Sequence, residues 1–155
     1  MGTEQMTAQE IYEKYKDDML KLIAYLPWLK EKSGKSPVAG NYDIDGLGER
    51  SMSFPVYDGN LLSFVKDAES TQFMDRNYVY VINCNGLRNP RQEKEFVKKQ
   101  DIYHISNVGG VLAKYVIEGR IKAGMWPEAV DKGIFLEIVT KLQEIYSDCL
   151  MWEKN

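Results

Sequence analysis

The 155-residue sequence contains a single histidine, His104, and only two cysteines, Cys84 and Cys149. Two cysteines that lie far apart do not form a disulfide framework, so we expect a reducing, cytoplasmic environment. A structural zinc site needs four Cys or His ligands, and the chain has no CxxC pair. We therefore expect no metal centre and no cofactor.

Long apolar runs are also absent. No apolar stretch approaches the ~18 residues of a transmembrane helix, and the first ten residues are polar, so we expect neither a membrane partner nor a secretion signal. The formal net charge of −3 argues against a protein that coats nucleic acid, because phosphate binding favours a basic excess. Internal repeats and low-complexity segments are missing too, which predicts a single domain over residues 1–155.

Helical periodicity dominates the segments that are present. Thr7 and Glu10 form a capping box at the start of an apolar-periodic helix that Pro27 kinks or ends. Alternation at residues 52–56 predicts a short strand, and the β-branched and aromatic run NYVYVIN at residues 77–83 predicts a second one. We predict an α+β fold that is predominantly α-helical, with five or six helices and one short two-stranded β element.

The longest loop-like stretch, residues 34–50, contains two alternating carboxylates, Asp43 and Asp45, followed by Gly46. This pattern is similar to the start of a calcium-binding loop. A full EF-hand loop needs a glutamate at its twelfth position, where this chain has Phe54. A solvated turn is therefore the favoured interpretation, and cation binding and order in this loop stay open.

Cys84 and His104, with Asn83 or Asn85, supply the residue types of a thiol-dependent hydrolase or transferase. Such an enzyme needs a histidine to lower the pKa of the thiol and a third group to orient that histidine. Nothing in the local sequence determines how these residues lie relative to one another. The alternative is an unreactive cysteine at the end of a strand and a polar histidine at the start of a helix.

A basic cluster lies within an acidic chain at residues 88–99, where Asn89, Pro90 and Gln92 predict the start of a helix. These twelve positions contain five basic residues and only two acidic ones. The basic residues are Arg88, Arg91, Lys94, Lys98 and Lys99. At helical spacing three of them share a face that could hold phosphates, with Tyr78 and Tyr80 available to stack a base. The alternative is a solvated helix face.

The stretch from residue 115 to residue 142 contains two glycine stops, at Gly124 and Gly133, and a restart at Trp126-Pro127. Arg120 could face the indole of Trp126 across the first stop and form a site for a small anionic or aromatic ligand. The alternative is a tryptophan that fills the joint between two helices.

This C-terminal third resembles an uncharacterised family of small bacterial and phage proteins, a domain of unknown function. The matching pieces are Tyr115-Val116, Gly119-Arg120, Gly124, the turn from Met125 to Lys132, Gly133-Ile134 and the helix to Leu142. The resemblance implies a bacterial or phage origin and an accessory role, and it brings no activity, substrate or cofactor.

Together these features favour a small, soluble, non-enzymatic binding protein that recognises a protein or a small anionic, nucleotide-like ligand. The predicted ligand-binding residues are Arg88, Arg91, Lys94, Lys98, Arg120 and Trp126. Two alternatives stay open: a thiol-dependent hydrolase or transferase that uses Cys84 and His104, and a structural module that forms homo-oligomers. The sequence does not identify the ligand, the partner or the oligomeric state.

Overall fold

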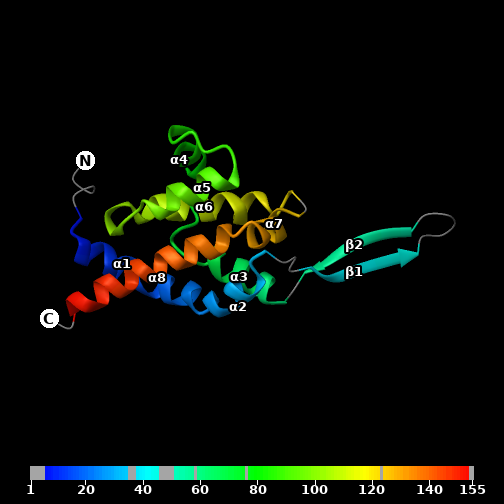
Figure 1. Ribbon diagram of the computed structural model, residues 1–155, viewed down its shortest axis with the longest axis horizontal. Helices are drawn as coiled ribbons and strands as arrows, with labels where there is room; N and C mark the ends of the chain where they lie inside the picture. The colour runs from blue at the N-terminus through cyan, green and yellow to red at the C-terminus, as the bar shows by residue number, and fades with distance from the viewer. Residues whose placement is uncertain are drawn as a thin grey trace.

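The computed structural model describes residues 6–34, 38–45, 51–57, 59–75, 77–122 and 124–153. Its elements are, in chain order, α1 (Ala8–Ile23), α2 (Leu26–Lys32), β1 (Val38–Asp45), β2 (Ser51–Tyr57), α3 (Gly59–Glu69), α4 (Tyr78–Cys84), α5 (Pro90–Lys98), the 3-10 helix η2 (Ile102–His104), α6 (Ile105–Glu118), α7 (Met125–Asp131) and α8 (Ile134–Glu153). The helices pack into one body, and the β1–β2 hairpin projects from it (Figure 1). None of the described helices is both long and apolar enough to cross a membrane.

The predicted α+β class is wrong, because the packed body is built of helices alone and the described residues form eight α-helices instead of five or six. The segment 77–83, predicted as a strand, forms most of α4. β-propensity reflects packing on a pleated surface, and α4 has no strand to pair with and lies instead against α6. The strand predicted at residues 52–56 lies within β2, but its partner is β1 and not the segment 77–83.

The hairpin outside the body pairs β1 with β2 in antiparallel register, with Tyr42 opposite Phe54. β1 comes from the stretch that the sequence predicted as a loop. The rest of the predicted cation loop, Gly46–Glu49, and the side chains of Asp43 and Asp45 lie outside the described residues.

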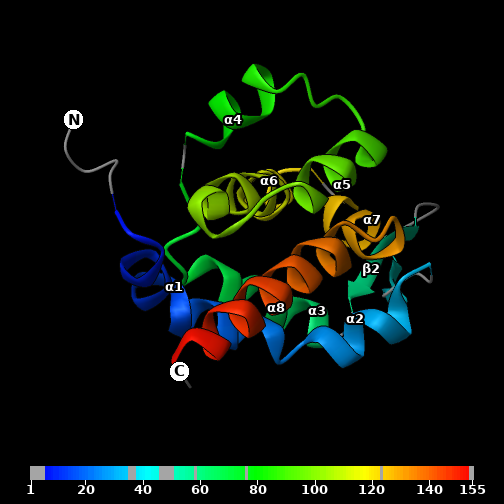
Figure 2. The same ribbon diagram turned by 60° about the vertical axis from the view of Figure 1, so that its left-hand side comes forward.

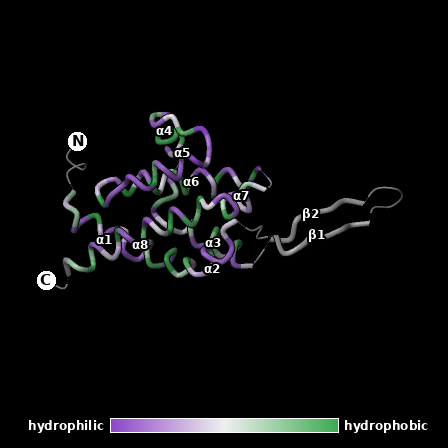
Figure 3. The backbone as a smooth tube through the Cα atoms, in the orientation of Figure 1, coloured by the Kyte–Doolittle hydropathy of each residue, from purple (hydrophilic) through white to green (hydrophobic). Residues whose placement is uncertain are grey.

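The 20-residue helix α8 runs through the body and contacts α1, α2, α5, α6 and α7 (Figure 2). Its residues Phe135, Ile138 and Leu142 recur at helical spacing and are completely buried. Tyr12 and Leu22 of α1 are equally buried and belong to the same core. Figure 3 shows the resulting alternation of apolar and polar residues along the helices.

Two glycines in the middle of α6 let other segments approach its backbone closely. A Cβ at Gly109 would lie 2.8 Å from Cδ1 of Phe73, and a Cβ at Gly110 would lie 3.0 Å from Cγ1 of Val81. Both distances are shorter than ordinary side-chain contacts, so these positions admit only glycine without a shift of their neighbours. The close contact between Val81 and Gly110 lets α4 pack directly against α6.

The joint between α6 and α7 depends on Gly119 and Trp126. The indole Nε1 of Trp126 donates a hydrogen bond to the carbonyl oxygen of Val116 at 3.2 Å, which places the ring over Gly119. Gly124 takes a left-handed conformation, with φ of +85°, and turns the chain into α7. The structure therefore uses Trp126 to fill the joint between two helices.

We expect Gly119→Ala to lower the free energy of unfolding by about 1–3 kcal/mol, the usual cost of overpacking. The added Cβ would overlap the Trp126 indole and would lie 2.7 Å from the carbonyl oxygen of Tyr115. Urea unfolding measures the change.

The matched control is Gly59→Ala, because nothing lies within 4 Å of a Cβ at that helical position. It should leave stability unchanged or raise it by up to about 1 kcal/mol. Equal losses in the two variants would contradict the role given to the Trp126 contact.

Candidate functional site

The candidate site is built around the start of α5. The side chain of Asn89 caps this helix by accepting a hydrogen bond from the backbone N–H of Gln92 at 2.9 Å. The Gln92 carboxamide oxygen in turn accepts from the backbone N–H of Arg88 at 2.7 Å. With Pro90 at the first helical position, these contacts hold the incoming chain and the first turn of α5 in one arrangement.

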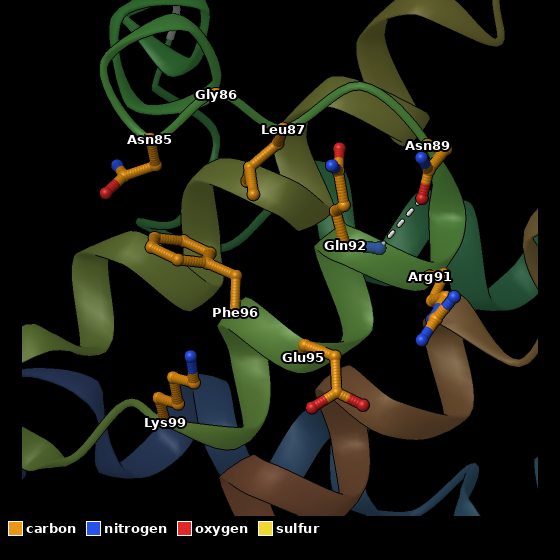
Figure 4. A pocket seen from close by; sticks show the side chains of 9 residues that line it. All are labelled: Asn85, Gly86, Leu87, Asn89, Arg91, Gln92, Glu95, Phe96 and Lys99. Atoms are coloured by element: carbon orange, nitrogen blue, oxygen red, sulfur yellow. Dashed lines mark hydrogen bonds between the residues drawn. The ribbon is translucent and has the colours of Figure 1, made fainter.

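A surface pocket of about 460 Å³ lies between α5 and the connection that leads to it from α4 (Figure 4). It is lined by Asn85, Gly86, Leu87, Asn89, Arg91, Gln92, Glu95, Phe96 and Lys99. Leu87 is buried and Phe96 is partly buried, and Figure 4 shows the Phe96 ring below Asn85 and Leu87. The pocket therefore combines one aromatic surface with charged and amide groups.

The charged residues of this pocket are spaced four apart along the chain, at Arg91, Glu95 and Lys99. All three are exposed, and none of their side chains makes an ion pair or a hydrogen bond within the part of the chain that the structure describes. Arg91 and Lys99 are eight residues apart, roughly 12 Å along a helix, so they cannot hold the same small group. The pocket thus presents two separate cations with a carboxylate between them.

The other predicted basic residues lie elsewhere around α5. Lys98 faces α8, where its Nζ is 3.8 Å from Oε1 of Glu137. Burial raises the pKa of Glu137, and the charges of Lys98 and Lys94 oppose this rise. Arg88 lines a different hollow, described below. The face predicted to join Arg91, Lys94 and Lys98 is therefore divided by the packing of α8 against α5.

Eight of the nine lining residues were outside the predicted binding set, which supplied only Arg91. Lys99 belonged to the basic cluster, and its spacing of four from Glu95 was the available signal. The positions of Asn85 and Phe96 in the pocket depend on how the α4–α5 connection folds back, which leaves no local pattern in the sequence.

The opposite face of α5 carries Glu93, whose side chain is completely buried. Its carboxylate accepts hydrogen bonds from Nζ of Lys114 and from the hydroxyl of Tyr115, the second at 2.5 Å. Burial, and then the Glu93 carboxylate, raise the pKa of Tyr115, so its phenol stays protonated and donates. A buried charge without partners is costly in free energy. The position of α5 on α6 in which Glu93 meets Lys114 and Tyr115 is therefore favoured over others.

A second hollow, of about 490 Å³, lies on this side of α5 and includes Arg88, Lys114 and Lys122 in its lining. Lys114 is already bound to Glu93, and Lys122 Nζ lies 3.2 Å from Oε1 of Glu118. Cations that already hold carboxylates are less available to a ligand, so this hollow is the weaker candidate of the two.

Arg120 and Trp126, which the sequence predicted as a pair, each bind another residue. Arg120 forms an ion pair with Glu69 of α3, and Trp126 donates to the carbonyl of Val116. The two side chains therefore tie α6 to different neighbours.

Cys84 and His104 also have separate partners. Nδ1 of His104 lies 2.8 Å from Oδ1 of Asp101, and this hydrogen bond lowers the pKa of Asp101. Cys84 is exposed at the end of α4, where its hydrogen bond with Tyr80 raises the pKa of that phenol. Among the described residues no hydrogen bond links Cys84 to His104, and none of their clusters of His, Cys, Asp and Glu could hold a metal ion.

Comparisons with known proteins give no match: no protein-family model, no curated protein and no solved structure is significantly similar to this chain. The resemblance over the C-terminal third stays a prediction.

We expect Cys84 to react with iodoacetamide at pH 7 no faster than an ordinary exposed thiol, because no hydrogen bond joins its thiol to the His104 imidazole among the described residues. His104→Ala should leave this rate unchanged. Mass spectrometry of the alkylated peptide measures it. A fast reaction that His104→Ala slows would support the thiol-enzyme alternative.

We expect Glu93→Gln to lower the free energy of unfolding by about 2–4 kcal/mol, because the substitution removes the charge that offsets Lys114. This loss of stability is smaller than that expected for a fully buried unpaired charge, because the Lys114 side chain is 20% exposed. Urea denaturation measures it.

Glu95→Gln is the control, because Glu95 is exposed on the same helix and is expected to change stability by less than about 0.5 kcal/mol. A Glu93→Gln protein as stable as the Glu95→Gln protein would show that the buried network contributes nothing.

Proposed function

We propose that this protein is a small non-enzymatic binding protein and that the pocket beside α5 holds a small anionic, nucleotide-like ligand. One observation carries the proposal: two cations without partners among the described residues, Arg91 and Lys99, line the same pocket of about 460 Å³ as the Phe96 ring. This volume lies within the range of ordinary ligand sites.

The order of the groups along α5 suggests how a nucleoside monophosphate would lie. Arg91 is at the N-terminal end of the helix, where a guanidinium and the helix dipole both favour a phosphate. Phe96 offers a flat apolar surface for the base, and Lys99 can donate to a ring carbonyl. Glu95, between them, can accept hydrogen bonds from the ribose hydroxyls.

The balance of charge favours one phosphate over several. The lining contains Arg91 and Lys99 against Glu95, and the carboxylate repels each further negative charge. We therefore infer a preference for monophosphates over triphosphates.

The role is non-catalytic in this proposal, because the nine described lining residues include neither a thiol nor an imidazole. We place the protein in a reducing cytoplasm, in line with two cysteines that form no disulfide, as an accessory factor of bacterial or phage origin.

We expect calorimetric titration with the four common nucleoside monophosphates to show binding, strongest for bases with a ring carbonyl such as uracil. Arg91→Ala should weaken UMP binding about tenfold and leave uridine binding unchanged, because only UMP carries the phosphate. Lys99→Ala should weaken UMP and uridine by similar factors.

Lys98→Ala is the matched control, since Lys98 is on the same helix but faces Glu137. It should leave both affinities unchanged. The proposal fails if no nucleotide gives heat, or if Lys98→Ala weakens UMP binding as much as Arg91→Ala does.

A further inference from the structure

A third cavity lies between η2 and the C-terminal half of α8, and its Gln100 directly follows Lys99 of the pocket beside α5. Its volume is about 290 Å³, and it shares no lining residue with the pocket beside α5. Its lining comes from residues 100–103 and from the part of α8 between Lys141 and Cys149.

The floor of this pocket is apolar. Ile102, Ile145 and Cys149 are 8%, 5% and 1% exposed, and the last two are one turn apart on α8. The ring of Tyr103, which is 60% exposed, adds an aromatic side. An apolar group that enters the pocket would leave water for these surfaces, which is favourable in proportion to the area buried.

The rim is acidic, in contrast to the pocket beside α5. Lys141 Nζ lies 3.2 Å from Oε1 of Glu144, so these two charges offset each other. Asp101 is bonded to His104. Asp148 has no ion pair or hydrogen bond within the described residues, and it lies one residue before Cys149 of the floor.

We propose that this pocket is a second binding site, for a small apolar organic cation such as a primary alkylamine. The alkyl chain would lie on Ile102 and Ile145, and the ammonium group would face Asp148. Tyr103 presents a ring to the same cation, an arrangement that attracts positive charge to the ring face. An anion would meet the Asp148 carboxylate, and a neutral ligand would leave that carboxylate without a partner.

The size of the pocket restricts the ligand further. Its volume of about 290 Å³ is at the lower limit of ligand sites, so it suits a chain of a few carbons and not a drug-sized molecule. The alkylation rate of Cys149, at the floor, reports whether the pocket is occupied. The alkylation rate of Cys84, which is exposed elsewhere, serves as the internal reference.

The test uses three probes of equal length, hexylamine, 1-hexanol and hexanoate, on the full chain. Calorimetry should show the order amine, alcohol, acid, with the amine bound at least about tenfold more tightly than the acid. Saturating hexylamine should slow the alkylation of Cys149 and leave the rate at Cys84 unchanged. UMP should not compete with hexylamine, so failure of either proposed site is separate from failure of the other.

Asp148→Asn removes the charge and keeps the shape. It should weaken hexylamine about fivefold and leave 1-hexanol unchanged, a factor typical of one partly exposed ion pair. Asp131→Asn, an exposed acid of α7, is the matched control and should change neither affinity.

Hexanoate binding as tight as hexylamine binding, or equal protection of both cysteines by the amine, would overturn the proposal. If Asp148→Asn does not fold, the comparison of amine with alcohol on the unaltered chain still decides the question. Equal affinities of these two probes would show that the rim charge has no part in binding.

Discussion

The buried carboxylate of Glu93 determines how α5 is rotated on the helical body. It binds Lys114 and Tyr115 of α6, and Val97, one turn further along α5, is buried on the same side. Residues three and four apart share a helix face, so this rotation directs the side chains of Arg91 and Lys99 toward solvent. The candidate pocket therefore depends on a contact made on the opposite face of the helix that forms it.

Helix α8 provides the second constraint, because its apolar face is shared by five other helices. Its packing against α5 directs Lys98 to Glu137 and away from the pocket. Its C-terminal half, with Asp148 and Cys149, forms one wall of the acidic pocket. The two pockets have rims of opposite charge, and for this reason we propose different ligand classes for them.

The sequence predicted features that depend on a few neighbouring residues. Thr7 and Glu10 form the expected capping box, and Asn89 caps α5 as its position before Pro90 indicated. The prediction of a strand at residues 77–83 was wrong, because side-chain type alone does not decide between a strand and a short helix. Val81 packs on Gly110 there, a contact between residues that are distant in sequence.

The helix caps, the glycine turns and the basic character of residues 88–99 follow from the sequence, because each depends on hydrogen bonds or charges within about one turn of chain. Which charges have partners depends on how the helices pack. Arg120 is bound to Glu69, Lys98 faces Glu137, and Arg91 is left in a pocket with Lys99. The physical reason is that helix rotation and packing, which no local pattern records, select the partner of every side chain on the surface.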